Sequence, residues 1–188
     1  EYVQSTQKYV DEGSLKSASE LYYPIRLKPQ GENTLENLHI RGVNHIEFRM
    51  FDVNPLSPIG ILEDDIKFVH CLIVYLMSQP KITLSDDEQI TAINNEKMAA
   101  RLDDEQTIEF LGDKRSIKSI ALDELCKIRK FYENFGDDEI LKIIDKQIDK
   151  IKYPDKRYAN IVKTEYGENY VKNGLKLAEK YQNELIDT

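Results

Sequence analysis

The sequence has few of the residues that build disulfide scaffolds and zinc sites. Its 188 residues include two cysteines, three histidines and no tryptophan. Cys71 and Cys126 form no CxxC pair and do not cluster with His39, His45 or His70, so no zinc site is expected. Two thiols without a disulfide framework are typical of the reducing cytoplasm, where we expect the protein to be located. We expect both thiols to be buried and to pack as small hydrophobic side chains.

A long hydrophobic run is also missing. The longest apolar run covers residues 71–77, far short of the ~20 residues that span a bilayer. The chain carries 34 acidic and 26 basic residues, which gives a formal net charge of −8. Nucleic acids and anionic membranes require a broad basic face, so neither is expected as a partner. The chain begins with Glu rather than Met, which favours a sequence cut from a longer protein.

The apolar pattern that is present predicts an α+β fold that is mainly α-helical. A chain of 188 residues is long enough for one domain or two small ones. Strands are expected at residues 22–28 and 45–51, with a short extended piece at 107–111. Helices are expected at residues 2–12, 35–41, 63–77, 85–101, 122–135, 137–153, 155–163 and from there to the end. We therefore predict a helical bundle packed on two or three strands. A strand-containing segment is expected at 1–60, and a helical region at 61–188 is expected to form one compact unit.

Some of these helices carry more detailed expectations. Residues 68–77 are apolar nearly all round, so we place this helix at the centre of the core. Ser85 and Glu88 have the spacing of a capping box at a helix start. Two middle helices have apolar stripes: Leu122, Leu125, Ile128, Phe131 and Phe135 in one, and Ile140, Ile144, Ile148 and Ile151 in the other. In the last helix the residues expected to face inwards are Val171, Gly174, Ala178, Tyr181 and Leu185.

Basic residues gather near the first two strands. Of the seven arginines in this acidic chain, Arg26, Arg41 and Arg49 fall within 24 residues of one another. Along the second strand, period-two alternation places Glu47 and Arg49 on one face together with His45. The opposite face of that strand is apolar.

This polar strand face has two interpretations. It is either the solvated face of an antiparallel strand with a cross-strand ion pair, or the floor of a site. In a site, Glu47 offers hard oxygen to Mg²⁺, and Arg49 offers a forked donor to phosphate or carboxylate. One carboxylate cannot hold Mg²⁺ alone, so the second interpretation requires further acidic ligands from elsewhere.

The order of residues adds a family resemblance. RGVNHIEFRMFDVNPLSPIG, at residues 41–60, resembles the strand-and-turn motif of bacterial glutamate–cysteine ligases, also called γ-glutamylcysteine synthetases. His45 replaces an aromatic residue that is usual there. Three other segments are similar to the family: LYYPIRLKP at 21–29, INNEKMAA at 93–100 and, more weakly, PDKRYANI at 154–161. The positions that match the main motif are Gly42, Ile46, Glu47, Arg49, Asp52, Asn54, Pro55, Pro58 and Gly60.

The resemblance implies part of a larger glutamine-synthetase-like ligase fold and a specific reaction. The family uses ATP and Mg²⁺ to phosphorylate the γ-carboxylate of glutamate, and the amine of cysteine then attacks the acyl phosphate. By position, Glu47 would be a magnesium ligand and Arg49 a catalytic residue that holds the transferred phosphoryl group or a substrate carboxylate. Arg26 would bind the nucleotide. Asn54 and Asp52 are expected to pin the turn through hydrogen bonds to nearby backbone.

Whole family members are more than twice as long as this chain. The resemblance therefore implies the C-terminal portion of such a ligase, or of its bifunctional glutathione-synthesising relative. The missing N-terminal half would supply the other metal-binding acids and most of the cysteine pocket, so this chain alone is expected to be inactive. Two alternatives stay open: a helical binding or regulatory module that keeps the motif as scaffold, and a carboxylate–amine ligase that uses another amine.

Overall fold

The computed structural model describes residues 2–186 of the chain. The chain divides into two compact units, Glu1–Val53 and Asn54–Thr188. The proline-rich turn at 54–60 therefore folds with the second unit. It does so because its hydrogen bonds lead there: the Tyr181 hydroxyl donates to the Pro55 carbonyl at 3.1 Å.

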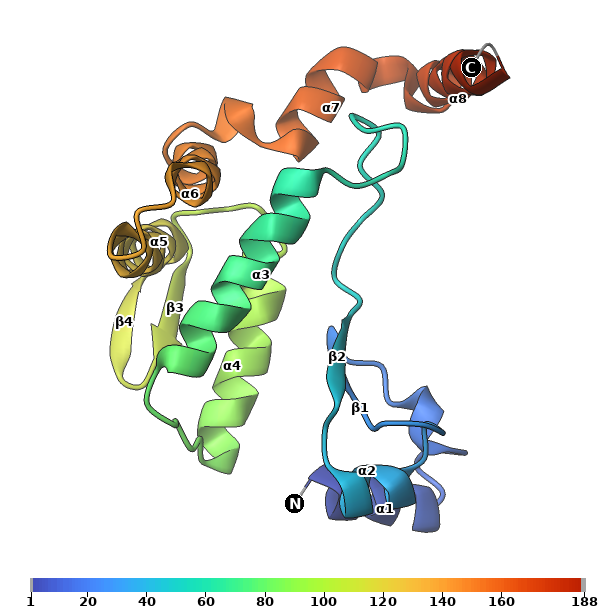
Figure 1. Cartoon of the computed structure of the whole chain (residues 1–188), viewed down its shortest axis with the longest axis vertical. Coiled ribbons are helices and arrows are strands. Elements are labelled where there is room, and N and C mark those ends of the chain that lie inside the picture. The colour runs from blue at the N-terminus through green and yellow to red at the C-terminus, as the bar shows by residue number, and fades with distance from the viewer. Residues whose placement is uncertain (1, 187–188) are drawn as a thin grey trace. The chain divides into compact units, whose positions relative to one another are not determined.

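The first unit places two helices beside a short hairpin (Figure 1). The helix α2 starts at Thr34, whose side chain accepts a hydrogen bond from the Asn37 N–H at 3.1 Å. It ends at Gly42, whose φ of 72° suits glycine. The elements of this unit are α1 (Tyr2–Asp11), η1 (Ala18–Glu20), β1 (Ile25–Lys28), α2 (Leu35–Arg41) and β2 (His45–Phe48).

The hairpin of β1 and β2 is antiparallel, and both strands are shorter than predicted. Pro24 and Pro29 flank β1, and since proline has no N–H to donate, they bound the ladder at both ends. Two further bonds extend the pairing: the Arg49 N–H donates to the Pro24 carbonyl and the Asn44 N–H donates to the Lys28 carbonyl, each at 2.8 Å. The register pairs Ile25 with Phe48, Arg26 with Glu47, Leu27 with Ile46, and Lys28 with His45.

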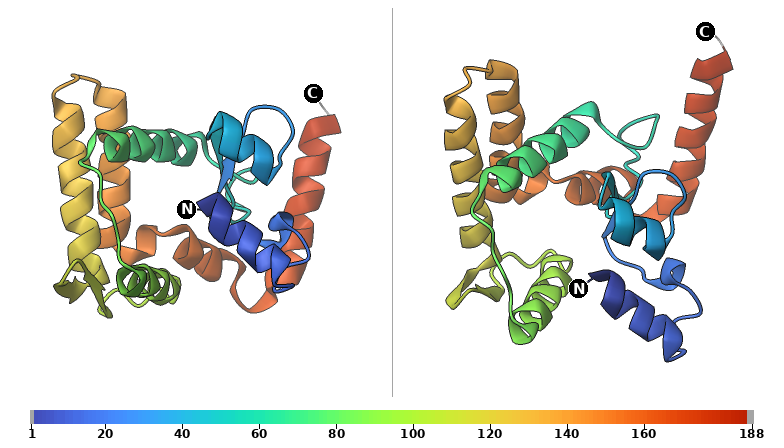
Figure 2. Two further views of the ribbon diagram at one scale, coloured as in Figure 1. Left: turned by 90° about the horizontal axis from the view of Figure 1, so that it is seen from below. Right: turned by 60° about the horizontal axis from the view of Figure 1, so that its bottom comes forward.

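The second unit is a helical layer with a second hairpin. In Figure 2, α5 and α6 lie side by side and α3 crosses them. Its elements are α3 (Glu63–Ser78), α4 (Asp86–Ala99), β3 (Thr107–Phe110), β4 (Asp113–Ser116), α5 (Ile117–Glu133), α6 (Asp138–Lys152), η2 (Pro154–Lys156), α7 (Tyr158–Tyr166), η3 (Gly167–Asn169) and α8 (Tyr170–Ile186). The prediction of a mainly helical α+β fold is thus confirmed.

The core of the second unit lies where α3, α5 and α6 meet. The predicted stripes on α5 and α6 enter it, except for Phe135, which lies beyond the end of α5 and is exposed. The rings of Tyr75 and Phe131 pack edge to face with their centroids 5.6 Å apart. The buried members of the core are Cys71, Tyr75, Leu125, Ile128, Tyr132, Ile144 and Ile148.

The hairpin of β3 and β4 is only half predicted by the sequence pattern. The extended piece expected at 107–111 is β3, but β4 was not expected because its sequence, DKRS, has no apolar alternation. The turn between the strands is formed by Leu111 and Gly112, which both have positive φ, at 49° and 81°. Positive φ at both turn residues matches the right-handed twist of a hairpin, so the turn itself specifies the pairing.

Helix α3 is not the central helix that the sequence predicted. Only the face of α3 that carries Cys71 and Tyr75 is buried. Leu76 and Met77 lie elsewhere on the helix and are 57% and 80% exposed. The prediction was wrong because, within the described part of the second unit, α5 and α6 cover a single side of α3. Among the described residues, no helix is both long and apolar enough to cross a membrane.

Two other burial predictions need correction. The apolar face of α8 does not point inwards as a whole: Val171 is 74% exposed, and of the predicted residues Tyr181 is half-buried. The side chain of Leu185 lies outside the described residues. Cys71 is buried as expected, but Cys126 is exposed because it lies on the outer face of α5.

Candidate functional site

The polar face of the first hairpin brings together most of the residues singled out in the sequence. Directly paired residues of an antiparallel sheet share a face, so Arg26 and Glu47 lie on the same side. Lys28 is two residues along β1 from Arg26 and therefore also lies on that side. The register covers only His45–Phe48 of the alternation predicted for the second strand. Exposure does not alternate there, since His45 and Ile46 are exposed while Glu47 and Phe48 are half-buried.

Glu47 is the centre of an ion-pair cluster. Its Oε1 accepts a hydrogen bond from the Nε of Arg49 at 2.5 Å. Its Oε2 lies 3.0 Å from the ammonium of Lys28. The Arg49 guanidinium also lies over the Tyr22 ring, 5.5 Å from the centroid, where its charge meets the negative face of the ring. We call Lys28, Glu47 and Arg49 the hairpin cluster.

The hairpin cluster keeps its carboxylate ionised. Hydrogen bonding to Arg49, and then to Lys28, lowers the pKa of Glu47 from its ordinary value of 4.5 to about 2. All three side chains are half-buried. An ionised carboxylate flanked by two cations can bind a metal ion or hold the cations in place for an anion.

Arg26 is held by a different partner. Its Nη2 donates to the Ser19 carbonyl at 2.6 Å, and the residue lines a small cavity of about 60 Å³ next to η1 and α2. Arg26 thus shares the face of Glu47 while its guanidinium is anchored to η1. Its predicted role in nucleotide binding stays a prediction.

Lys28 is the residue of this face that was missed in the sequence. Its side chain is 16% exposed, against 34% for Glu47, so it is the more enclosed partner. A signal for it existed, because Arg26 and Lys28 alternate along the YYPIRLK segment with the same period as Glu47 and Arg49.

The turn that follows the hairpin is pinned by its own polar side chains. Asn54 Oδ1 accepts a hydrogen bond from the Leu56 N–H at 3.0 Å, as predicted for this residue. The Asn54 N–H donates to the Gly60 carbonyl at 2.8 Å and closes the loop. The Ser57 hydroxyl donates to the Ile61 carbonyl at 2.8 Å. Asp52 is exposed, and its role stays a prediction.

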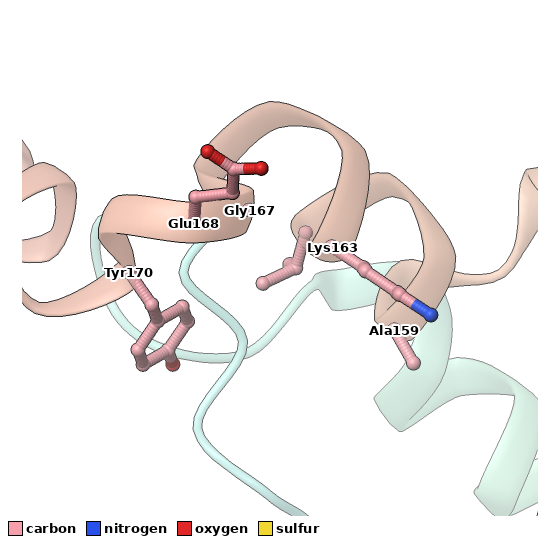
Figure 3. A pocket seen from close by; sticks show the side chains of 6 residues that line it. Ala159, Lys163, Gly167, Glu168 and Tyr170 are labelled. Atoms are coloured by element: carbon pink, nitrogen blue, oxygen red, sulfur yellow. The ribbon is translucent and has the colours of Figure 1, made fainter.

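A pocket in the second unit offers no comparable chemistry. It is a depression of about 570 Å³ at the junction of α7, η3 and α8. In Figure 3, the charged ends of Lys163 and Glu168 point away from each other. The walls are otherwise formed by Ala159, Val162, Gly167 and Tyr170. An open, mostly apolar depression without converging charges has no arrangement for catalysis.

The donors of the first hairpin fit a metal ion that arrives with phosphate. Within residues 2–186, no group of three or more His, Cys, Asp or Glu could hold a metal ion. Mg²⁺ is commonly bound by one or two carboxylates together with phosphate oxygens. Glu47 can supply such a carboxylate, and Arg49 and Lys28 can neutralise phosphate. These residues do not fit a metal held by protein ligands alone.

The fold of the chain is shared with parts of two larger solved structures. The chain is similar to the crystal structure of a glutamate–cysteine ligase from Francisella tularensis in complex with AMP, with a TM-score of 0.83 and 20% identity over 90% of this chain and 36% of that one. It is also similar to a bifunctional glutathione synthetase from Pasteurella multocida, with a TM-score of 0.71 and 22% identity over 95% of this chain and 24% of that one.

The sequence comparisons then give the family. The sequence model of the glutamate-cysteine ligase family matches residues 2–99. The chain therefore belongs to this family. It is 31% identical, over 97% of its length, to a glutathione biosynthesis bifunctional protein of Listeria innocua, of which it covers 25%. It is 33% identical, over 88% of its length, to a glutamate–cysteine ligase of Clostridium acetobutylicum, of which it covers 33%. The chain thus spans a quarter to a third of the length of these relatives.

Proposed function

We propose that this chain supplies one side of the active site of an ATP- and Mg²⁺-dependent glutamate–cysteine ligase. The hairpin cluster is the observation that carries the proposal. It places an ionised carboxylate between two cations on a strand face within the part of the chain that matches the family. The substrates implied by the family are glutamate and cysteine, and the reaction is the first step of glutathione synthesis.

Each residue of the face has a role in this proposal. When bound, Mg²⁺·ATP supplies the phosphoryl group that activates the γ-carboxylate of glutamate for attack by the cysteine amine. Glu47 binds the metal through its carboxylate. Arg49 holds the transferred phosphoryl group or a substrate carboxylate, since its guanidinium has further N–H donors besides the Nε that contacts Glu47. Arg26 binds the nucleotide. Such phosphoryl transfer depends mainly on positioning and charge neutralisation.

We also propose that residues 1–188 do not catalyse the reaction alone. A single carboxylate is too few ligands for a stable magnesium site, and the relatives are three to four times longer than the matched region. We propose that the remaining metal ligands and most of the cysteine pocket come from an N-terminal half of the kind these relatives have. The free thiols of Cys71 and Cys126 fit the cytoplasm, where we place this activity.

A chimeric enzyme tests the proposal without reference to any flanking sequence. Residues 1–188 replace the corresponding third of the Clostridium acetobutylicum ligase, and phosphate release is measured with ATP, Mg²⁺, glutamate and cysteine. We expect Glu47→Gln and Arg49→Met each to lower kcat by about 10²-fold or more, as loss of one charge-stabilising group does. The matched control is Lys142→Met, on the exposed face of α6. A folded chimera in which both variants keep the wild-type rate contradicts the proposal.

One observation favours a second candidate function. Both oxygens of Glu47 already contact cations, which is how a purely structural ion pair is built. The chain would then be a non-catalytic binding or regulatory module that keeps the motif as scaffold. Under this alternative, Glu47→Gln lowers the melting temperature but leaves kcat of the chimera unchanged. Replacing cysteine by other amino acids in the assay separates the proposed reaction from that of a ligase with another amine.

A further inference from the structure

Helix α3 has two apolar faces, and one of them stays largely exposed. The inner face carries Cys71 and Tyr75 and packs against α5 and α6 (Figure 2). Ile66, Ile73 and Met77 are seven and four residues apart, so they line one side of the helix, turned away from the inner face. Ile66 is 52% exposed and Met77 is 80% exposed. We call the side defined by Ile66, Ile73 and Met77 the outer face of α3.

The outer face has almost no polar character. Val74 and Leu76 flank it and are 40% and 57% exposed, which widens the apolar surface. His70 is the only polar side chain on this side of α3 between Ile66 and Met77. A helix face that meets water normally carries charged side chains, and a contiguous exposed apolar patch marks an interaction surface. The outer face therefore has the composition of a surface that another element covers.

The longer relatives offer an occupant for this face. The Francisella tularensis ligase shares the fold over 90% of this chain, and the chain covers 36% of it. Helix α3 lies wholly within residues 2–99, which match the family model. A helix that is apolar all round is usually enclosed on every side. A longer chain with the same fold has the polypeptide to enclose α3.

A lipid surface has less support as the occupant. Amphipathic helices that bind membranes carry lysine and arginine along their polar face. The only such residue of α3 is Lys67, and its ammonium is paired with Glu63 and Glu139. The net charge of −8 also opposes binding to an anionic membrane. A protein surface is therefore the better fit.

We propose that the outer face of α3 is the surface on which the N-terminal half of a glutamate–cysteine ligase docks. The docked surface is made of apolar side chains, because His70 alone offers a hydrogen-bonding partner on this face. This inference rests on the proposed function, in which the same half supplies the remaining metal ligands. It adds the place of docking. With α5 and α6 on one side and that half on the other, α3 becomes a central helix of the assembled enzyme.

Methionine oxidation measures the cover of this face. Met77 is one of three methionines in the chain, with Met50 and Met98, and mass spectrometry of their peptides follows each thioether in dilute hydrogen peroxide. The 188-residue chain is compared with the chimeric enzyme, in which the same residues stand within the Clostridium acetobutylicum ligase. We expect Met77 to be oxidised at least about 10-fold more slowly in the chimera than in the chain alone. A free methionine peptide in both samples is the control for the peroxide.

A charge placed on the outer face gives a second readout. Met77→Asp is compared with Cys126→Asp, which changes an exposed residue of α5 outside the residues that match the family model. In the 188-residue chain the two variants should lower the melting temperature by similar small amounts, because both positions are exposed. In the chimera, Met77→Asp should lower it at least about 3-fold more than Cys126→Asp, because the carboxylate is then buried among apolar side chains.

The outcomes separate this inference from the proposed function. An active chimera in which Met77 is oxidised as fast as in the chain alone overturns the docking and leaves the proposed function standing. An inactive chimera with a protected Met77 supports the docking and contradicts the proposed active site. Protection already present in the 188-residue chain overturns the docking, and protection that rises with protein concentration identifies a second copy as the occupant. A chimera without cooperative melting also contradicts the docking, since a matching face should restore the cover of α3.

Discussion

Arg157 and Asp104 form a two-pronged ion pair that joins the start of α7 to the loop before β3. The Nη1 of Arg157 donates to Asp104 Oδ1 at 2.9 Å, and its Nη2 contacts Oδ2. The Nε of the same arginine donates to the Lys150 carbonyl at 2.8 Å, near the end of α6. Both charged side chains are less than one-fifth exposed, so the pair is shielded from water and salt. One guanidinium thus ties three segments of the second unit together.

We expect Arg157→Ala to lower the free energy of unfolding by about 2–4 kcal/mol, since it leaves Asp104 half-buried without its partner. Arg157→Lys is expected to recover only part of this, because an ammonium cannot make the paired contact. Urea denaturation of the 188-residue chain measures both. The control is Lys127→Ala, which removes an exposed pair with Glu124 and costs below about 0.5 kcal/mol. Equal losses at Arg157 and Lys127 would show that the pair is not structural.

Ile144 and Met77 mark the two extremes of apolar burial in the second unit. Ile144 is fully buried between α3, α5 and α6, whereas Met77 is 80% exposed. Ile144→Ala should therefore lower the free energy of unfolding by about 2–5 kcal/mol through lost burial and a cavity. Met77→Ala should change it by less than about 0.5 kcal/mol. The urea midpoints of the two variants decide this, and a Met77 effect as large as that of Ile144 would mean that α3 is covered on both faces.

Helix α4 depends on its cap more than on its packing. None of its described side chains is buried, and its start is a capping box in which Ser85 accepts from the Glu88 N–H while Glu88 Oε2 accepts from the Ser85 N–H at 2.7 Å. Ser85→Ala should destabilise the helix by about 1 kcal/mol. The loss is expected as faster hydrogen exchange of the α4 amides, with those of α6 unchanged. Exchange that accelerates equally in both helices would contradict a local role.

These helices also show which structural features can be predicted from a short stretch of sequence and which cannot. The capping box at Ser85 was predictable because its two partners are three residues apart. The α6 stripe that includes Ile144 was predictable because its period matches a helix with one buried face. Residues 68–77 are apolar all round, but whether Met77 is buried depends on what packs against α3, and no local pattern contains that information.

In the candidate site, too, local patterns predicted some features, but contacts between distant segments could not be predicted. The shared face of Glu47 and Arg49 was predicted from alternation, and the ion pair between them places the two side chains together. Lys28 was missed because the ion pair with Glu47 joins two strands, and its partner is chosen by register rather than by spacing. The anchoring of Arg26 to the Ser19 carbonyl depends on the path of η1, a segment for which no helix or strand was predicted.

The acidity of Glu47 gives the last prediction and the most direct measure of the hairpin cluster. Its pKa is lowered to about 2, first by the hydrogen bond from Arg49 and then by that from Lys28. A carboxyl whose folded pKa lies below its unfolded value stabilises the fold at pH above the unfolded value of 4.5. That contribution is lost as the pH falls from there towards 2, and the melting temperature should fall with it.

NMR titration of the Glu47 carboxyl carbon from about pH 6 down to about pH 1 checks the assignment, because this range spans both the ordinary pKa of 4.5 and the lowered value of about 2. We expect a midpoint near pH 2 in the wild type. Arg49→Met should raise the midpoint more than Lys28→Met, because the contact with Arg49 has the larger effect on the pKa. Lys81→Met should leave it unchanged. A wild-type midpoint near 4.5 would mean that the ion pairs with Arg49 and Lys28 do not persist in solution.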